Sequence, residues 1–149
     1  MDIIPVDKDQ RFWNIVFTAG FAVLFIFLAV IVREVRHGFP TSISFFDLAL
    51  LILATFRTIR LFVYDQITQF VRDFFAKEVS GPLRAANDLM LCPWCFGMWS
   101  GLFLTFFYFV APIAWFAILV LAISGVASFI QILINMIGWR AEELKGEVV

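Results

Sequence analysis

The two cysteines of this chain, Cys92 and Cys95, are the side chains best suited to chemistry, and they form a Cys-x-x-Cys pair. Pro93 follows the first cysteine and opens a long apolar run, which is typical of a helix entrance. A thiol at a helix N-terminus has a lowered pKa, so the pair suits a reversible disulfide. The same spacing supplies half of a zinc site, although the single histidine, His37, is expected across the membrane from it. The third interpretation is a structural helix entrance, and it is the one that we favour.

Three charged residues form a candidate polar constellation at the predicted cytoplasmic membrane edge: Arg57, Arg60 and Asp65. A guanidinium held in hydrocarbon costs at least ~2.5–3.5 kcal/mol, so it is normally paired, hydrated or extended toward the headgroups. Both arginines fall toward the end of their predicted helix, where phosphate headgroups are near. We therefore expect interfacial anchoring with a salt bridge to Asp65 or Asp88, and the alternative is a polar pathway or an anion site.

The composition places these residues in a membrane protein. Of the 149 residues, 62% are hydrophobic, 20 are Phe and only 15% are charged, whereas soluble domains are roughly 25% charged. A water-soluble core of this size cannot bury that apolar excess, so lipid must solvate most of the chain. The net charge of −1 argues against a nucleic-acid binder. The predicted fold class is all-α and integral to the membrane.

Four transmembrane helices are predicted from the apolar runs, at about 14–32, 46–64, 93–110 and 113–138. An amphipathic helix at about 67–78 is too short to span a bilayer and should lie in the interface. Because only Ala111 and Pro112 separate the last two spans, these should form an antiparallel hairpin.

The predicted spans make one transmembrane domain at 14–138. Between the amphipathic helix and the third span, residues 84–88 are expected to form a polar connector. Two tails lie outside the domain, a polar one at 1–13 and a charged one at 139–149.

Lysine and arginine residues set the predicted orientation, because cytoplasmic loops carry an excess of them. With four spans, seven basic residues fall on one side: Lys8, Arg11, Arg72, Lys77, Arg84, Arg140 and Lys145. Only Arg33 and Arg36 fall on the other side. We therefore predict a multi-pass protein of the bacterial inner membrane, with both termini, the amphipathic helix and the cysteine pair on the cytoplasmic side.

Small residues at four-residue spacing predict close helix packing in the last two spans. They are Gly97 and Gly101 in one helix, and Ser124 and Ser128 in the other. The packing partner is either another helix of the same chain or a second subunit. Gln131 and Asn135, four residues apart, are expected to hydrogen-bond across helices, and lining a pore is the alternative.

Two stretches form distinctive strings. One is Leu53-Ala54-Thr55-Phe56-Arg57-Thr58-Ile59-Arg60-Leu61 with Asp65 following, and the other is Cys92-Pro93-Trp94-Cys95-Phe96-Gly97-Met98-Trp99. Together, over about 45–138, they resemble a small family of bacterial membrane proteins catalogued as domain of unknown function 1360, whose members include a sporulation-associated protein. The chain departs from the family at Thr58-Ile59, where the family tends to show Leu-Thr. The resemblance implies a compact, mostly α membrane domain in which the arginines, Asp65 and the Cys-Pro-Trp-Cys string share one constellation, and it implies no activity.

These observations predict a membrane anchor, scaffold or assembly component that acts through helix–helix association and is not an enzyme. No nucleotide-binding loop, metalloprotease helix or catalytic triad is recognisable, and one histidine leaves little for acid–base chemistry. We expect no catalytic residue, cofactor, metal or nucleic acid, and the expected partners are the lipid bilayer and a second copy or another membrane protein. One alternative is a homo-oligomeric channel with Arg57, Arg60, Gln131 or Asn135 facing its lumen. The other is a thiol–disulfide or zinc-linked protein that uses Cys92 and Cys95.

Overall fold

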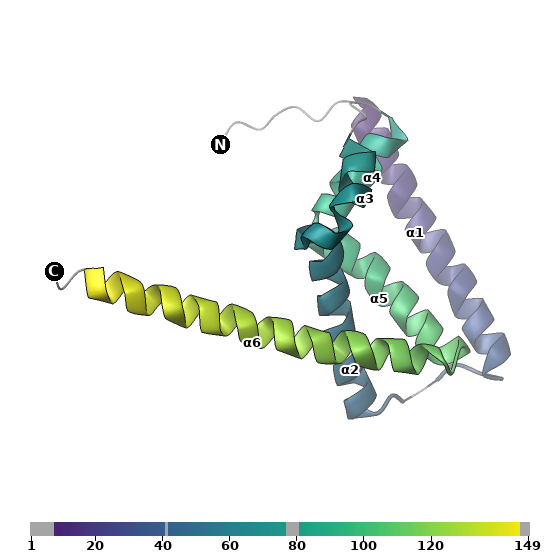
Figure 1. The fold of residues 1–149 in the computed structure, drawn as a ribbon. Helices are drawn as coiled ribbons and strands as arrows, with labels where there is room; N and C mark the ends of the chain where they lie inside the picture. The colour runs from purple at the N-terminus through teal and green to yellow at the C-terminus, as the bar shows by residue number, and fades with distance from the viewer. Residues whose placement is uncertain (1–7, 41, 77–80, 147–149) are drawn as a thin grey trace.

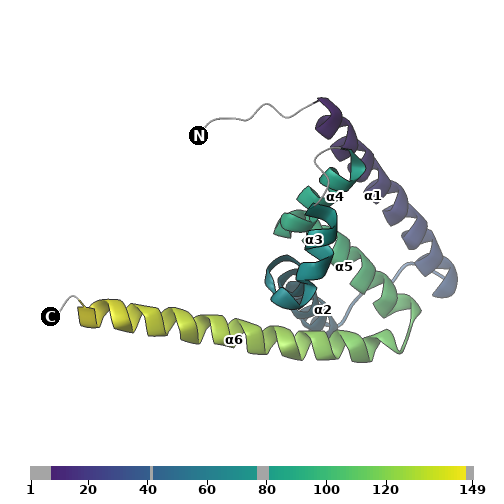
Figure 2. The same cartoon turned by 45° about the horizontal axis from the view of Figure 1, so that its top comes forward.

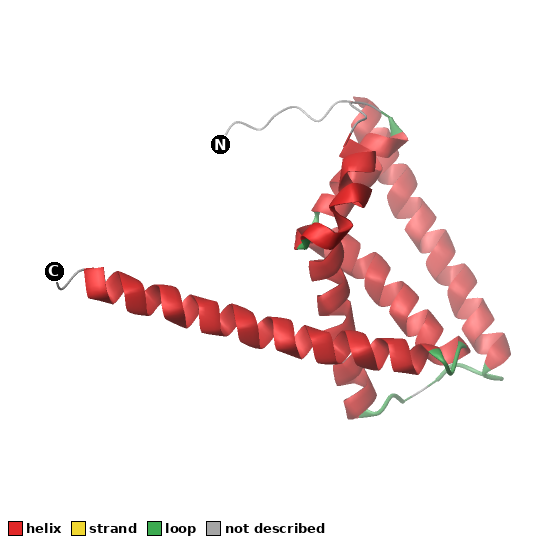
Figure 3. Ribbon diagram, in the orientation of Figure 1, coloured by secondary structure: helices red, strands yellow, loops and turns green. Residues whose placement is uncertain are grey.

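The computed structural model describes residues 8–40, 42–76 and 81–146, without the side chains of 8, 9, 76 and 144–146. Every regular element in those ranges is helical (Figure 3), so the predicted all-α fold is confirmed. The six α-helices, drawn in Figure 1, are α1 (Lys8–Val35), α2 (Phe45–Ile59), α3 (Gln69–Ala76), α4 (Pro82–Leu91), α5 (Pro93–Val110) and α6 (Ala114–Gly146). A π-helical turn, η1 (Arg60–Tyr64), extends α2, and a 3-10 turn, η2 (Gln66–Thr68), leads into α3.

Three helices, and not the predicted four, are long and apolar enough to cross a membrane within the described part of the chain. They are Gln10–Val35, Pro93–Val110 and Ala114–Glu143. The span predicted at 46–64 is the one that falls short. Its helix α2 has 15 residues, or about 22 Å, whereas the hydrocarbon core of a bilayer is about 30 Å thick. Its extension through η1 adds Arg60 to Arg57, so the added length is also more polar. In Figure 1, α2 carries the chain back from the end of α1 toward the start of α5.

The helix bounds follow the predicted ones where proline marks an end. α5 begins at Pro93 and ends at Val110 because a Pro at the first position suits a helix start and Pro112 prevents continuation. α1 and α6 are longer than predicted, since both continue into the charged flanks: α1 begins at Lys8 and α6 reaches Gly146. The charged tail predicted at 139–149 is therefore helical up to Gly146.

The polar connector predicted at 84–88 was wrong, because this segment lies inside α4. Gly81 precedes α4 with a φ of +80°, a conformation that glycine adopts without strain, and Pro82 takes the first turn. The residues that follow are mostly good helix formers, so a polar composition here did not mean a loop.

The amphipathic helix predicted at 67–78 corresponds to η2 and α3, and residues 77 and 78 lie outside the described ranges. Its apolar side chains Ile67, Phe70 and Phe74 are exposed. Its place in the membrane interface stays a prediction.

The packing is centred on α2, against which both α5 and α6 lie. The buried core joins α2 to α6 through Leu50, Leu51, Ala54, Ile118 and Ala122. Past this crossing α6 runs away from the other helices (Figures 1 and 2). The predicted antiparallel hairpin of the last two spans is therefore not formed: α6 packs mainly on α2 and diverges from α5.

Candidate functional site

The end of α2 brings Arg57 and Asp65 together. Nη1 of Arg57 donates to Oδ2 of Asp65 at 2.9 Å, and the two side chains are 21% and 27% exposed. Eight residues separate them, which in an uninterrupted α-helix sets side chains about 80° apart around the axis. The turn η1 reduces this offset because it holds one more residue per hydrogen-bonded turn, with the Asp65 N–H donating to the Arg60 carbonyl at 2.9 Å.

Two side chains from the following segment satisfy carbonyl groups that η1 leaves without a helical partner. The buried hydroxyl of Thr68 donates to the Leu61 carbonyl. Nη1 of Arg72 donates to the Phe62 carbonyl at 2.8 Å. Sequence reasoning missed both roles, since no pattern in the sequence identifies a π turn, although Thr68 and Arg72 do lie four residues apart on a helical face.

Arg60 does not join the ion pair. Its guanidinium carbon lies 5.5 Å from the centroid of the Tyr64 ring, which is a cation–π contact. Asp88, the other predicted partner for the arginines, accepts a hydrogen bond from Gln10 at the start of α1. The structure thus brings Arg57 and Asp65 together and gives Arg60 a different neighbour.

The cysteine pair forms the N-terminal end of α5. Cys92 is the N-cap residue, and its sulfur accepts a hydrogen bond from the Cys95 N–H at 3.3 Å. Hydrogen bonds from the Cys95 thiol, and then from the Cys95 N–H, hold the pKa of Cys92 below its ordinary value. Both thiols are free, and Cys95 is exposed. The Cys92 sulfur therefore caps α5, and the same hydrogen bonds favour its thiolate form.

A zinc site at this pair needs ligands from elsewhere. Over the ranges 8–40, 42–76 and 81–146, no group of three His, Cys, Asp or Glu residues is placed to hold a metal ion. His37 follows the far end of α1, whose 28 residues extend about 42 Å. At this site the described residues supply two zinc ligands, the sulfurs of Cys92 and Cys95. The zinc interpretation therefore requires further ligands from a partner.

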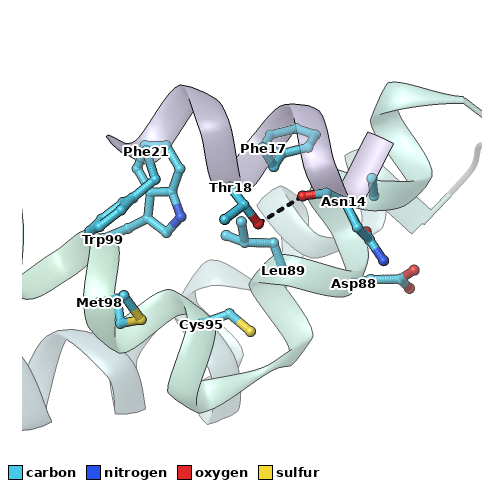
Figure 4. Close-up of a pocket in the computed structure, with 10 residues that line it drawn as sticks. Asn14, Phe17, Thr18, Phe21, Asp88, Leu89, Cys95, Met98 and Trp99 are labelled. Carbon is cyan, nitrogen blue, oxygen red and sulfur yellow. Dashed lines mark hydrogen bonds between the residues drawn. The ribbon is translucent and has the colours of Figure 1, made fainter. Parts of the chain in front are cut away.

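The start of α1 lies beside the cysteine pair across a cavity of about 400 Å³ (Figure 4). Cys95 and Trp99 line it from α5, Asp88 from α4, and Asn14 and Phe21 from α1. The rings of Phe21 and Trp99 meet edge to face, with centroids 5.1 Å apart. This contact and the Gln10–Asp88 hydrogen bond place the start of α1 and the cysteine pair at the same end of the molecule.

Apolar contacts join the end of α2 to the start of α5. The rings of Phe62 and Phe96 have centroids 5.3 Å apart. A Cβ built on Gly97 would lie 3.0 Å from Cδ1 of Ile59, so this glycine allows the two helices to approach. The ion pair and the cysteine pair are therefore neighbours through these side chains.

A close approach of two helices occurs at Gly125, a glycine that was not among the predicted packing residues. A Cβ on Gly125 of α6 would lie 2.6 Å from the Leu53 carbonyl oxygen of α2, and 3.4 Å from Cβ of Arg57. The predicted Gly101 is less constrained, with Cγ2 of Thr55 at 4.0 Å. Gly125 lies directly beside Ser124, so the close approach falls in the region that the small-residue stripe indicated.

The polar residues of α6 bond within the helix. The Ser128 hydroxyl donates to the Ser124 carbonyl at 2.9 Å. Nε2 of Gln131 donates to Oδ1 of Asn135 at 3.1 Å, and both of these amides are exposed. Ser124 and Ser128 are half-buried near the crossing with α2, whereas the amides lie beyond it.

Comparisons with known proteins point to a family of unknown function. The family described as "Protein of unknown function (DUF1360)" matches residues 50–87 and 80–134, a region that holds the ion pair, the cysteine pair and Gly125. The UPF0713 protein YngL of Bacillus subtilis (strain 168) is 32% identical over 102 residues, which cover 60% of this chain and 78% of that protein. The sporulation protein YjcA of the same organism is 33% identical over 106 residues, which cover 59% of this chain and 90% of that protein. No solved structure matches this chain.

Proposed function

This chain belongs to the DUF1360 family, and we propose that it is a membrane-embedded assembly or anchoring component that binds another membrane helix through α6 and performs no catalysis. Its three apolar helices are suited to a bilayer. The relative named a sporulation protein supplies one setting in which to look for the partner.

One observation carries the proposal: the second half of α6 is not covered by its own chain. Every described side chain from 130 to 143 is exposed. The large apolar ones are Ile130, Ile132, Leu133, Ile134, Met136, Ile137 and Trp139. A helix with large apolar side chains over most of its exposed surface is stable only in lipid or against other helices. With 33 residues, α6 is also longer than the roughly 20 that a span needs.

The polar groups around the turn η1 support the non-catalytic part of the proposal. Arg57 and Asp65 neutralise each other, and Thr68 and Arg72 are engaged with backbone carbonyls. These groups hold a turn in shape, which is the requirement for a rigid docking platform.

Photo-crosslinking in intact membranes tests the proposal. A benzophenone amino acid is placed at Ile134 of α6, which is 55% exposed, and in a control variant at Phe25 of α1, which is 53% exposed. We expect a discrete protein adduct from position 134 and lipid adducts from position 25. Lipid adducts alone from both positions would contradict an assembly role.

The Cys92 thiol favours a second candidate function, which is thiol–disulfide exchange. Its sulfur lies at the N-terminus of α5 and its pKa is lowered. In this reaction the Cys92 thiolate attacks a partner disulfide, and Cys95 then resolves the mixed disulfide, so that the partner gains two thiols and this chain a Cys92–Cys95 disulfide. Acid trapping followed by alkylation tests it: Cys95→Ala should accumulate a mixed disulfide through Cys92. Thiols that stay fully reduced in the wild type, with no trapped species in the variant, would exclude exchange.

For the orientation, we propose that the cysteine end of the molecule faces the cytoplasm of a bacterial inner membrane. Support comes from basic residues at this end, since Arg72 and Arg84 belong to α3 and α4 and Arg11 to the start of α1. Arg33 in the last turn of α1 and Arg36 directly after α1 lie at the other end and oppose this balance.

A further inference from the structure

We propose that α6 carries a self-association surface, the amide stripe Ser128, Gln131, Asn135 and Gly138, on which a second copy of this chain docks. The inference rests on the proposed function and names its partner. Steps of three, four and three residues place these four positions on one side of α6.

The amide stripe is a different face from the one that α6 uses within its own chain. Ile118, Ala122 and Gly125 pack against α2. At 100° per residue, their mean direction differs from that of the stripe by about 120°. Docking on the stripe therefore leaves the contact between α2 and α6 intact. Gln131, Asn135 and Gly138 are exposed, and Ser128, nearest the crossing with α2, is half-buried.

The amides give this face a specific chemistry. Gln131 and Asn135 lie inside the apolar segment Ala114–Glu143, and the one hydrogen bond between them uses one donor and one acceptor. A carboxamide has two N–H donors and a carbonyl acceptor, so donors and acceptors remain on both side chains. In hydrocarbon there is no water to satisfy them, and an unsatisfied polar group costs free energy.

A second copy of the same chain satisfies this requirement. Two copies inserted with the same orientation present parallel α6 helices, so a two-fold axis along the membrane normal places Gln131 opposite Gln131 and Asn135 opposite Asn135. Each amide is both donor and acceptor, so identical side chains are complementary without any charge. Ser128 and Gly138 flank the amides, and a Cβ on Gly138 would meet nothing within 4 Å in its own chain. Small flanking residues allow the two backbones to approach.

Disulfide crosslinking of the full chain in membranes tests the inference. In a Cys92→Ala/Cys95→Ala background, Ser128→Cys and Gly138→Cys report on the stripe. Leu133→Cys is the matched control, since Leu133 is 37% exposed and lies on the opposite side of α6. We expect dimers from the first two variants under mild oxidation and not from the third. Adding Gln131→Leu and Asn135→Leu should raise the dimer dissociation constant roughly 5- to 30-fold, measured by energy transfer between labelled copies at decreasing density in vesicles.

The outcomes separate the inference from the proposed function. Equal crosslinking from Leu133→Cys and Ser128→Cys, or dimers unaffected by the leucine substitutions, would overturn the amide stripe. Monomers throughout, with a photo-adduct from Ile134 to a different protein, would overturn the second copy as partner and leave the assembly role standing. Monomers throughout with lipid adducts alone would overturn both.

Discussion

At the scale of single residues, the groups near the ends of α2 and α5 are held by neighbours that are close in sequence. Arg57 pairs with Asp65, Arg60 lies over the Tyr64 ring, and the Cys92 sulfur accepts from Cys95. Each of these contacts spans at most eight residues. They therefore fix local shape, whereas the side-chain contacts described here between distant parts of the chain are apolar apart from the Gln10–Asp88 hydrogen bond.

The ion pair should contribute measurably to stability. Arg57→Gln leaves the Asp65 carboxylate without its partner, and its partial burial sets an expected loss of about 1–2 kcal/mol, between the values for exposed and buried pairs. Thermal unfolding in mild detergent should show a midpoint lower by roughly 2–6 °C.

A double-mutant cycle identifies the source of that loss. Asp65→Asn should cost a similar amount, and the double variant should cost less than the two single variants together. Arg140→Gln, on the exposed end of α6, is the control and should leave the midpoint unchanged. Strictly additive losses would show that Arg57 acts through something other than Asp65.

The lowered pKa of Cys92 predicts a pH profile. Because the thiolate is the reactive form, alkylation of Cys92 by iodoacetamide should reach its half-maximal rate at a pH below the ordinary thiol pKa. Cys95→Ala removes the thiol hydrogen bond, the largest cause of the shift, so its profile should move to higher pH. The hydrogen bond from the backbone N–H of residue 95 remains, so the pKa of Cys92 should rise only part of the way to the ordinary thiol value. An unchanged profile would assign the shift to the backbone alone.

At the scale of elements, the sequence predicted helices well and their joints poorly. α5 could be bounded at Pro93 and Val110 because proline has strong positional preferences. α4 was not predicted, because its polar side chains resemble those of a connector although most of its residues are good helix formers. No characteristic amino-acid composition marks a π turn. The sequence therefore predicted a salt bridge from the arginines to either Asp65 or Asp88 and could not decide between them. The crossing of α6 over α2 depends on backbone approach at Gly125, which a search for four-residue stripes does not single out.

A side chain added at Gly125 would disturb the contact between α2 and α6. Gly125→Ala forces its methyl group into the Leu53 carbonyl oxygen, which is backbone and cannot rotate away. We expect a loss of about 1–3 kcal/mol, as for other overpacked sites. Gly20→Ala in α1 is the matched control: a Cβ there meets nothing within 4 Å, and the change should be neutral or stabilising by up to about 1 kcal/mol. Thermal unfolding of both variants in the same detergent tests this difference. Equal unfolding midpoints for the two variants would contradict the close approach at Gly125.

At the scale of the whole molecule, the two ends of the helical assembly differ in chemistry. The cysteine pair, α3, α4 and the start of α1 lie at one end, and the loop after α1 lies at the other. This separation makes the proposed orientation testable without reference to the number of spans.

A membrane-impermeant maleimide should label the native cysteines in inverted vesicles and not in right-side-out ones. In a Cys92→Ala/Cys95→Ala background, Phe39→Cys marks the loop after α1, where Phe39 is 61% exposed, and should be labelled in right-side-out vesicles. Labelling of both positions from the same side would contradict the arrangement, and the reverse pattern would invert the proposed orientation.

The packing of α2 against α6 also sets an order of events during synthesis. Gly125 follows Leu53 by 72 residues, so at roughly 5–20 residues per second α2 waits about 4–14 s for the helix that covers it. The Arg57–Asp65 pair closes within nine residues and needs none of that later chain. During synthesis, α2 can therefore enter the membrane with Arg57 already neutralised by Asp65. The two apolar helices that pack against it, α5 and then α6, are made later.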